Sequence, residues 1–145
     1  MKKNRAGNRM GNRTGSRIVS AAAAVCAAFT VVIVFAGEPN DAKIAAFLKG
    51  YGWEITGGCI ETADVIIPEP FDLVYENYNE LQKQAGLDLE PYMGKCGVRC
   101  TYEVANYPYE TGEQVRANVI VIDGECVGGD ICTVSLDGFI HSLKY

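Results

Sequence analysis

The stretch Gly128–His141, with the sequence GGDICTVSLDGFIH, gathers residue types that perform thiol and hydrolytic chemistry. It contains a thiol at Cys132, a carboxylate at Asp137 and the only histidine of the chain, His141. A thiolate nucleophile needs a base within hydrogen-bonding reach and a third group that orients this base. The three residues could therefore form the active site of a thiol-dependent or hydrolytic enzyme.

The elements expected around these residues do not favour this arrangement. Cys132 should lie within a strand, whereas His141 follows a turn and should lie on a short helix capped by Asp137. An Asp–His pair four residues apart on a surface helix is usually structural. Ser135 lacks the glycine-flanked turn that exposes the serine of α/β hydrolases. We therefore assign no catalytic, cofactor-binding or metal-binding residue, and the enzyme remains an alternative.

The second half of the chain predicts an antiparallel meander. Residues 98–105 alternate between apolar and polar side chains, as in a half-buried strand. After a loop over 106–112, two further strands are expected at 114–122 and 125–134. Asp123-Gly124 between them is typical of a two-residue hairpin turn, in which both central residues need positive φ.

This hairpin leaves two orientations open for Asp130. In an unbroken register Asp130 points into a face of valines, where a lone carboxylate is costly and its pKa is raised. A β-bulge at Gly128-Gly129 would instead place Asp130 opposite Asn118 and within reach of Arg116. It would also turn Ile131 toward the valines. We favour the bulge, because it buries an isoleucine and pairs a charge.

The first half predicts two helices and short apolar strands. Asn40 should cap a helix that ends at Gly50. A strand is expected over 51–56, followed by a Gly57-Gly58 turn and a second apolar run at 63–67.

A longer helix is expected to begin at Asp72 and to end at Gly86. Its apolar positions recur at spacings of three and four and should face the core, namely Phe71, Val74, Tyr75, Tyr78, Leu81 and Ala85. The positions expected to face away are Glu76, Asn79, Glu80 and Lys83.

The folded part carries an odd number of cysteines, Cys59, Cys96, Cys100, Cys126 and Cys132, so they cannot all pair. Cys96 and Cys100 share a strand face but lie ~13 Å apart, which is too far for a disulfide. Their spacing is also wrong for a zinc knuckle. A disulfide that involves Cys59 stays open.

Charge divides the chain into unequal parts. Residues 1–17 carry six basic residues and no acidic one, whereas residues 37–145 carry seven basic and 18 acidic residues, a net charge of −11. Between them, residues 18–36 hold no charged side chain: IVSAAAAVCAAFTVVIVFA. As a helix this segment would span roughly 28 Å, close to the ~30 Å hydrocarbon core of a bilayer. We therefore predict a transmembrane helix over 18–36.

The flanking charges predict the orientation. The positive-inside rule places residues 1–17 in the cytoplasm, as a basic disordered tail, and residues 37–145 outside. Cleavage of a signal peptide after Ala36 is the alternative, in which the folded part is secreted. We favour the uncleaved anchor because the apolar segment reaches full membrane length. Phosphate would repel the acidic part, so no nucleic acid partner is expected.

Several stretches together resemble an uncharacterised domain family of clostridia-like Gram-positive bacteria. They are YGWEI, PFDLVYENYNELQKQAGLDL, YEVANYP, VRAN and GGDICTVSLDGFIHSL. The resemblance covers about residues 41–143, and the last motif is the most specific. It implies small proteins with a single N-terminal membrane segment. It implies no activity, cofactor or catalytic residue.

The expected fold class is α+β: an N-terminal transmembrane helix, then a small antiparallel sheet packed by one or two helices. The expected role is a membrane-anchored, extracytoplasmic binding or regulatory module of the bacterial cell envelope. It would be non-enzymatic, without a cofactor, and would bind a protein partner at the envelope. The alternatives are the enzyme built on Cys132, His141 and Asp137, and an acidic cation-binding or assembly domain.

Overall fold

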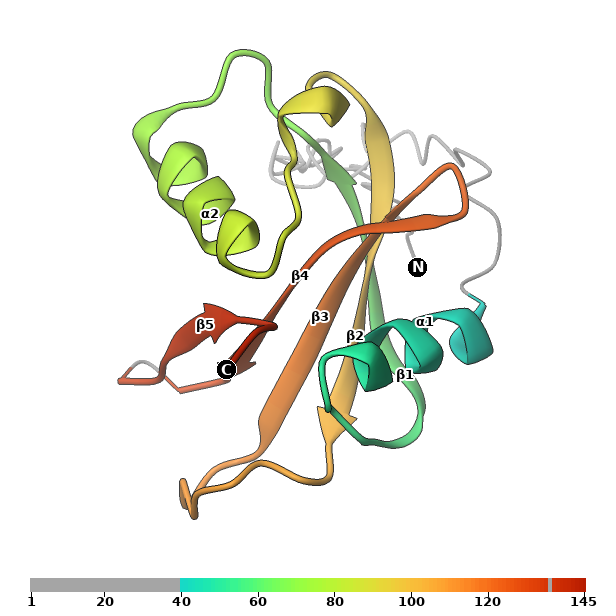
Figure 1. Cartoon of the computed structure of the whole chain (residues 1–145), viewed down its shortest axis with the longest axis vertical. Helices are drawn as coiled ribbons and strands as arrows, with labels where there is room; N and C mark the ends of the chain where they lie inside the picture. The colour runs from blue at the N-terminus through green and yellow to red at the C-terminus, as the bar shows by residue number, and fades with distance from the viewer. Residues whose placement is uncertain (1–39, 136) are drawn as a thin grey trace, which may run out of the picture. The chain divides into compact units, whose positions relative to one another are not determined.

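The computed structural model describes residues 40–135 and 137–145 (Figure 1). The predictions for residues 1–17, the apolar segment 18–36 and cleavage after Ala36 lie outside the described residues. Within the described part of the chain, no helix is both long and apolar enough to span a membrane.

Five antiparallel strands form one sheet in the order β1-β2-β3-β4-β5, so that neighbours in the chain are neighbours in the sheet. The strands are β1 (Ile55–Ile66), β2 (Cys96–Val104), β3 (Val115–Ile122), β4 (Glu125–Thr133) and β5 (Ile140–Ser142). The helices are α1 (Asp41–Gly50), α2 (Leu73–Gln84) and the short 3₁₀ helix η2 (Glu90–Tyr92). The predicted α+β class and the antiparallel sheet are confirmed.

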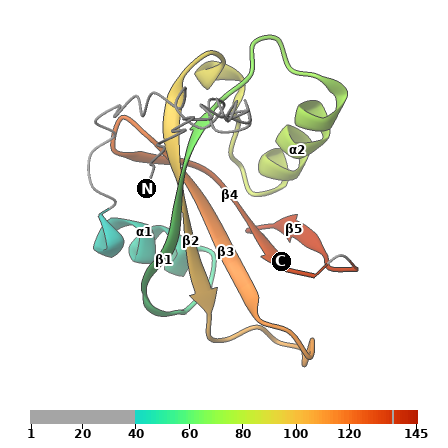
Figure 2. The ribbon, with the colours of Figure 1, turned by 180° about the vertical axis from the view of Figure 1, so that it is seen from behind.

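The sheet has two buried faces, each with its own core. Because side chains alternate along β3, Val119 and Ile120 belong to different cores. The α1 face contains Ile44 and Leu48 of α1 and a long apolar row of the sheet. The α2 face packs against Tyr75 and Tyr78 of α2. In the two opposite views of Figures 1 and 2, α1 lies beside β1 and β2, and α2 lies beside β4 and β5.

The helix α1 forms where it was predicted. The Asn40 side chain accepts a hydrogen bond from the Lys43 amide at 3.1 Å, which caps the helix. Ile44 and Leu48 are one turn apart and are both buried. The Lys43 ammonium donates to the Gly124 carbonyl and pairs with Glu125, both at 2.6 Å. These contacts attach α1 to the β3–β4 hairpin.

The strand β1 differs from the prediction. The expected strand at 51–56, the turn at Gly57-Gly58 and the apolar run at 63–67 are largely replaced by one strand, Ile55–Ile66. Its pairing with β2 shifts register between Thr56 and Glu61. Gly57 adopts φ +71 there, so the glycine pair supplies an irregularity within the strand rather than a hairpin turn.

The β3–β4 hairpin confirms the predicted turn and bulge. Asp123 and Gly124 have φ of 51 and 77. The pairs Val121–Cys126 and Ile120–Gly128 flank one extra residue, Val127. The bulge thus lies one position before Gly128-Gly129. It places Asp130 opposite Asn118 and buries Ile131 on the α1 face, as expected.

Gly129 is needed for a different reason. A Cβ atom there would lie 2.6 Å from the Asn118 carbonyl oxygen and 2.9 Å from Leu143 Cδ1. Backbone and core side chains therefore approach this position more closely than any larger residue allows.

The helix α2 begins at its predicted cap, Asp72, which accepts from the Tyr75 amide at 2.8 Å. Its buried positions differ from the prediction. Asn79 and Gln82 are 1% and 0% exposed, whereas Val74 is 74% exposed. The Asn79 side chain accepts from the Leu89 amide, and Gln82 accepts from the Gly129 amide. These backbone groups need partners, and so the helix turns polar residues inward.

Candidate functional site

The structure separates Cys132 from His141. The predicted short helix after Asp137 is wrong, because His141 lies in β5 and pairs with Ile131. Directly opposite residues point to the same face, so His141 shares the α1 face with Ile131. Cys132 follows Ile131 and points to the α2 face. Asp137 is exposed in the turn between the strands. The three residues therefore do not form the arrangement that a thiol or hydrolytic enzyme needs.

Asp130 lies in a hydrogen-bonded polar layer on the α2 face, formed by Tyr78, Thr101, Asn118 and Asp130. Its two oxygens accept from the Tyr78 hydroxyl at 2.8 Å and from Asn118 Nδ2 at 2.9 Å. The Thr101 hydroxyl donates to Asn118 Oδ1 at 2.8 Å. Asp130 is only 3% exposed, and burial raises its pKa, although the bonds from Asn118 and Tyr78 oppose this rise.

The predicted pairing of Asp130 with Arg116 is wrong. Arg116 instead lies 3.9 Å from Glu61, the carboxylate that also pairs with Arg99 at 3.2 Å. Neutral donors satisfy Asp130, because α2 brings Tyr78 over it and the register brings Asn118 beside it. The side chain is thus held inside the fold rather than presented for chemistry.

Cys132 is also unsuited to act as a nucleophile. Its sulfur lies 3.3 Å from Asn118 Nδ2, which donates to it. Burial, together with the nearby Asp130 carboxylate, raises the pKa of the Cys132 thiol. A raised pKa lowers the thiolate fraction at neutral pH, opposite to what a reactive cysteine needs.

His141 belongs to an aromatic cluster, which we define as Trp53, Tyr107, Tyr109, Phe139, His141 and Tyr145. The His141 ring lies 5.0 Å from Tyr145 and 5.4 Å from Phe139, measured between ring centroids. Tyr107 stacks on Phe139 at 5.3 Å. The Trp53 indole donates to the Leu143 carbonyl at 2.7 Å, which holds the C-terminal strand against the cluster.

Both ring nitrogens of His141 have partners. Nδ1 lies 2.7 Å from the Ser142 carbonyl oxygen, which can only accept, so Nδ1 carries a proton. Nε2 lies 3.2 Å from the Tyr107 hydroxyl. These two contacts orient the ring within the cluster, which fits a structural and surface role better than that of a general base.

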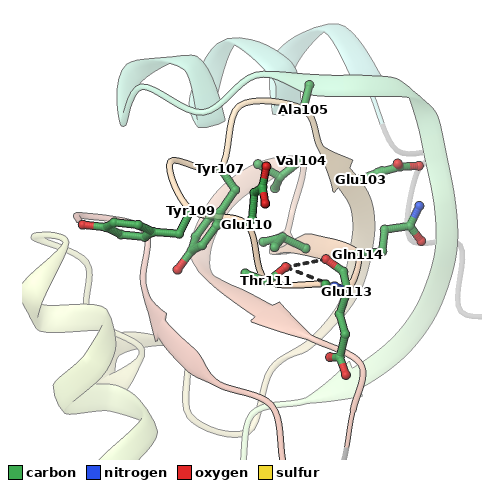
Figure 3. Close-up of a pocket in the computed structure, with 11 residues that line it drawn as sticks. Glu103, Val104, Ala105, Tyr107, Tyr109, Glu110, Thr111, Glu113 and Gln114 are labelled. Atoms are coloured by element: carbon green, nitrogen blue, oxygen red, sulfur yellow. Dashed lines mark hydrogen bonds between the residues drawn. The ribbon is translucent and has the colours of Figure 1, made fainter.

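An open pocket of about 520 Å³ lies beside this cluster, between the ends of β2 and β3. Figure 3 shows Tyr107 and Tyr109 on one side of it and Glu103 and Gln114 on the other. Its lining also includes two further carboxylates, Glu110 and Glu113. The pocket therefore combines aromatic rings with three acidic side chains.

Sequence reasoning missed this site. The loop over 106–112 was expected, but its tyrosines meet Trp53, His141 and Tyr145 only after the whole sheet has formed. The closely spaced aromatic and acidic residues in ANYPYE were a local signal. Within residues 40–135 and 137–145, no three His, Cys, Asp or Glu side chains come together as a metal ion would require.

The model of one protein family matches residues 47–131, which is more than half of the chain. The chain belongs to the family described as Domain of unknown function (DUF4830). The predicted resemblance to an uncharacterised family is thereby confirmed at this level. No curated protein and no solved structure matches the chain.

The DUF4830 match covers the polar layer around Asp130 completely and the aromatic cluster with its pocket only in part. It includes the whole polar layer up to Asp130, and the pocket loop between β2 and β3. It ends before Phe139, His141 and Tyr145 of the aromatic cluster. The matched residues thus contain the glutamates and tyrosines that line the pocket. The residues after the match supply further rings that contact these tyrosines in the aromatic cluster.

Proposed function

We propose that this DUF4830 protein is a non-enzymatic binding module of the bacterial cell envelope. The pocket beside Tyr107 and Tyr109 carries this proposal, because tyrosine and glutamate side chains line the same open hollow. The separation of Cys132 from His141 on opposite faces of the sheet removes the arrangement that favoured an enzyme.

The lining indicates the chemical class of the ligand. Carboxylates form charge-assisted hydrogen bonds with ammonium and guanidinium groups, and tyrosine faces attract the same cations. A lysine- or arginine-bearing segment of a protein partner fits both properties. The net charge of −11 over residues 37–145 would attract such a segment and repel nucleic acid.

The envelope location rests on the first part of the chain. Six basic residues precede the uncharged segment 18–36, which supports an anchor with its N-terminus in the cytoplasm. Release of the folded part after Ala36 would leave the same pocket outside the membrane. In both cases the partner is an extracytoplasmic protein or a domain of a neighbouring membrane protein.

The binding proposal is tested with the full-length chain in detergent micelles and a fluorescent peptide of alternating lysine and glycine. The double variant Glu110→Gln/Glu113→Gln should bind at least about tenfold more weakly, because two charge-assisted contacts are removed. The separate variant Tyr109→Ala should also weaken binding, because it removes a ring face that attracts the lysine ammonium group. Fluorescence anisotropy at several salt concentrations measures both effects.

A matched control separates pocket contacts from overall charge. Glu76→Gln/Glu80→Gln removes the same charge from the exposed side of α2, at a distance from the pocket loop in the fold. This control should retain nearly the affinity of the wild type. Equal weakening by both double variants would show unspecific attraction to an acidic surface, and the pocket proposal would then be wrong.

The location is tested by thiol labelling of intact cells. Cys96 is exposed at the start of β2 and should react with a membrane-impermeant maleimide. With Cys96→Ser this label should fall to the weaker reaction of the partly buried Cys59. A cysteine introduced by Ser16→Cys into a Cys59→Ser/Cys96→Ser chain should react only after permeabilisation. Labelling of Ser16→Cys in intact cells, with protection of Cys96, would reverse the proposed orientation.

A further inference from the structure

Three thiols gather on the α1 face of the sheet. Cys100 is fully buried within that core, and Cys59 and Cys126 are partly buried and pack against it. Cys59 lies in β1 and Cys100 in the adjacent strand β2. These two cysteines are therefore on neighbouring strands, unlike pairs between β2 and β4.

The irregular part of β1 places Cys59 against the same core as Cys100. The register shift lies between Thr56 and Glu61, and regular pairing resumes with Glu61 opposite Thr101, so that Thr62 lies opposite Cys100. The Cys59 thiol donates to the Glu61 carbonyl at 3.1 Å, a contact within its own strand. Without the extra residues of this irregularity, Cys59 would lie farther from Cys100 along the sheet.

The start of α1 covers the site of Cys59 and Cys100. A Cβ atom on Gly58 would lie 3.1 Å from Asp41 Oδ2, so the irregular segment packs directly against the helix. The Tyr102 hydroxyl donates to the other Asp41 oxygen at 2.7 Å. Desolvation, followed by the neighbouring Cys59 thiol, raises the pKa of Cys100 to about 12. The two thiols are close, and Cys59 is the one that solvent reaches.

We propose that Cys59 and Cys100 form a reversible disulfide by exchange with an external disulfide compound, RSSR. The Cys59 thiolate attacks one sulfur of RSSR, so that a mixed disulfide forms and one RS⁻ leaves. The Cys100 thiol then attacks the Cys59 sulfur and passes its proton to the leaving group, which departs as the second RSH. The two protein thiols lose two electrons and two protons, and RSSR becomes two RSH.

This bond would join the edge strand β1 to β2 beneath the first turn of α1. It would close a long loop that contains α2 and η2, and so restrict the unfolded chain. The oxidised protein should therefore melt at a temperature roughly 10 °C above that of the reduced protein. The inference does not depend on the ligand or location proposed above.

The test uses the full-length chain in detergent, incubated with oxidised glutathione or with dithiothreitol. Remaining thiols are alkylated, and a non-reducing peptide map identifies the cysteines that are joined. We expect one linked peptide pair that contains Cys59 and Cys100, and the higher melting temperature only in the oxidised sample. Cys59→Ser should abolish both results.

Cys96→Ser is the matched control, because Cys96 is exposed on the same strand as Cys100 and has no place in the proposed bond. It should leave the linked pair and the melting shift unchanged. A link from Cys100 to Cys126, a link that needs Cys96, or complete alkylation of Cys59 and Cys100 after oxidation would each overturn the proposal.

Discussion

The two faces of this sheet bury similar strands in different ways. On the α1 face, Leu48 packs among apolar side chains, and the buried Tyr102 donates its hydroxyl to Asp41, an exposed carboxylate at the start of α1. On the α2 face, Asn79, Gln82 and Asp130 are at most 3% exposed and form defined hydrogen bonds. One face is held mainly by apolar packing, and the other by a combination of apolar packing and directional polar contacts.

The two kinds of stabilisation are sensitive to different substitutions. Apolar packing is non-directional and scales with the area removed from water, so truncation is its main weakness. A buried polar contact adds a modest net free energy, but removing one partner leaves the other without a hydrogen bond. The faces should therefore respond differently to substitutions that remove the same number of atoms.

Truncation on the α1 face should have the largest effect. Leu48→Ala removes a fully buried side chain from the centre of the α1 contact, and should lower the free energy of unfolding by about 3 kcal/mol. Urea denaturation followed by Trp53 fluorescence measures this loss. A change below 1 kcal/mol would indicate that α1 does not seal this core.

On the α2 face, Asn79→Ala should lower the free energy of unfolding by about 2 kcal/mol. The Leu89 amide, which bonds to Asn79 at 2.8 Å, would be left buried without a partner. Val74→Ser on the same helix is the control and should change stability by less than about 0.5 kcal/mol, because Val74 is exposed. A larger loss for Val74→Ser than for Asn79→Ala would instead support the sequence-based prediction, in which Val74 faces the core and Asn79 faces away.

Asp130→Asn should change the pH dependence of the free energy of unfolding. Burial raises the pKa of Asp130 in the folded state, so the folded protein binds this proton more tightly than the unfolded chain. The wild type should therefore lose stability relative to the variant as pH rises from about 4 through the raised pKa, by at most ~1.4 kcal/mol per pH unit.

Urea denaturation of both proteins between pH 4 and pH 8 measures this difference. Subtracting the two curves removes the contributions of the other carboxylates, which the proteins share. Parallel curves, or a wild type that gains stability with rising pH, would contradict a raised pKa at Asp130.

Much of the fold could be predicted because its signals are local. The caps at Asn40 and Asp72, the Asp123-Gly124 turn and the alternation along β2 each depend on a few adjacent residues. The orientation of Asp130 could also be predicted, since burying Ile131 required a bulge. Its partner was misassigned to Arg116, because nothing local shows that Tyr78 of α2 lies above it.

The remaining errors concern contacts between distant segments. Val74 and Asn79 exchange their expected roles because the partners of Asn79, the Leu89 amide and Asp88, come from the loop that follows α2. His141 lies in a strand because β4 offers it an unpaired edge, which its own neighbours do not reveal. The pocket was missed for the same reason, since its rings are brought together by the completed sheet.

The polar layer has a consequence for how the strands find their alignment. Alternating apolar residues look the same after a sliding error of two positions, because every side chain returns to its original face. The hydrogen bonds from Thr101 to Asn118 and from Asn118 to Asp130 would not survive this error, because each joins side chains that lie directly opposite in the sheet. Such an error would leave both contacts broken inside the protein, so these three residues distinguish the native alignment of β2, β3 and β4 from its nearest competitor.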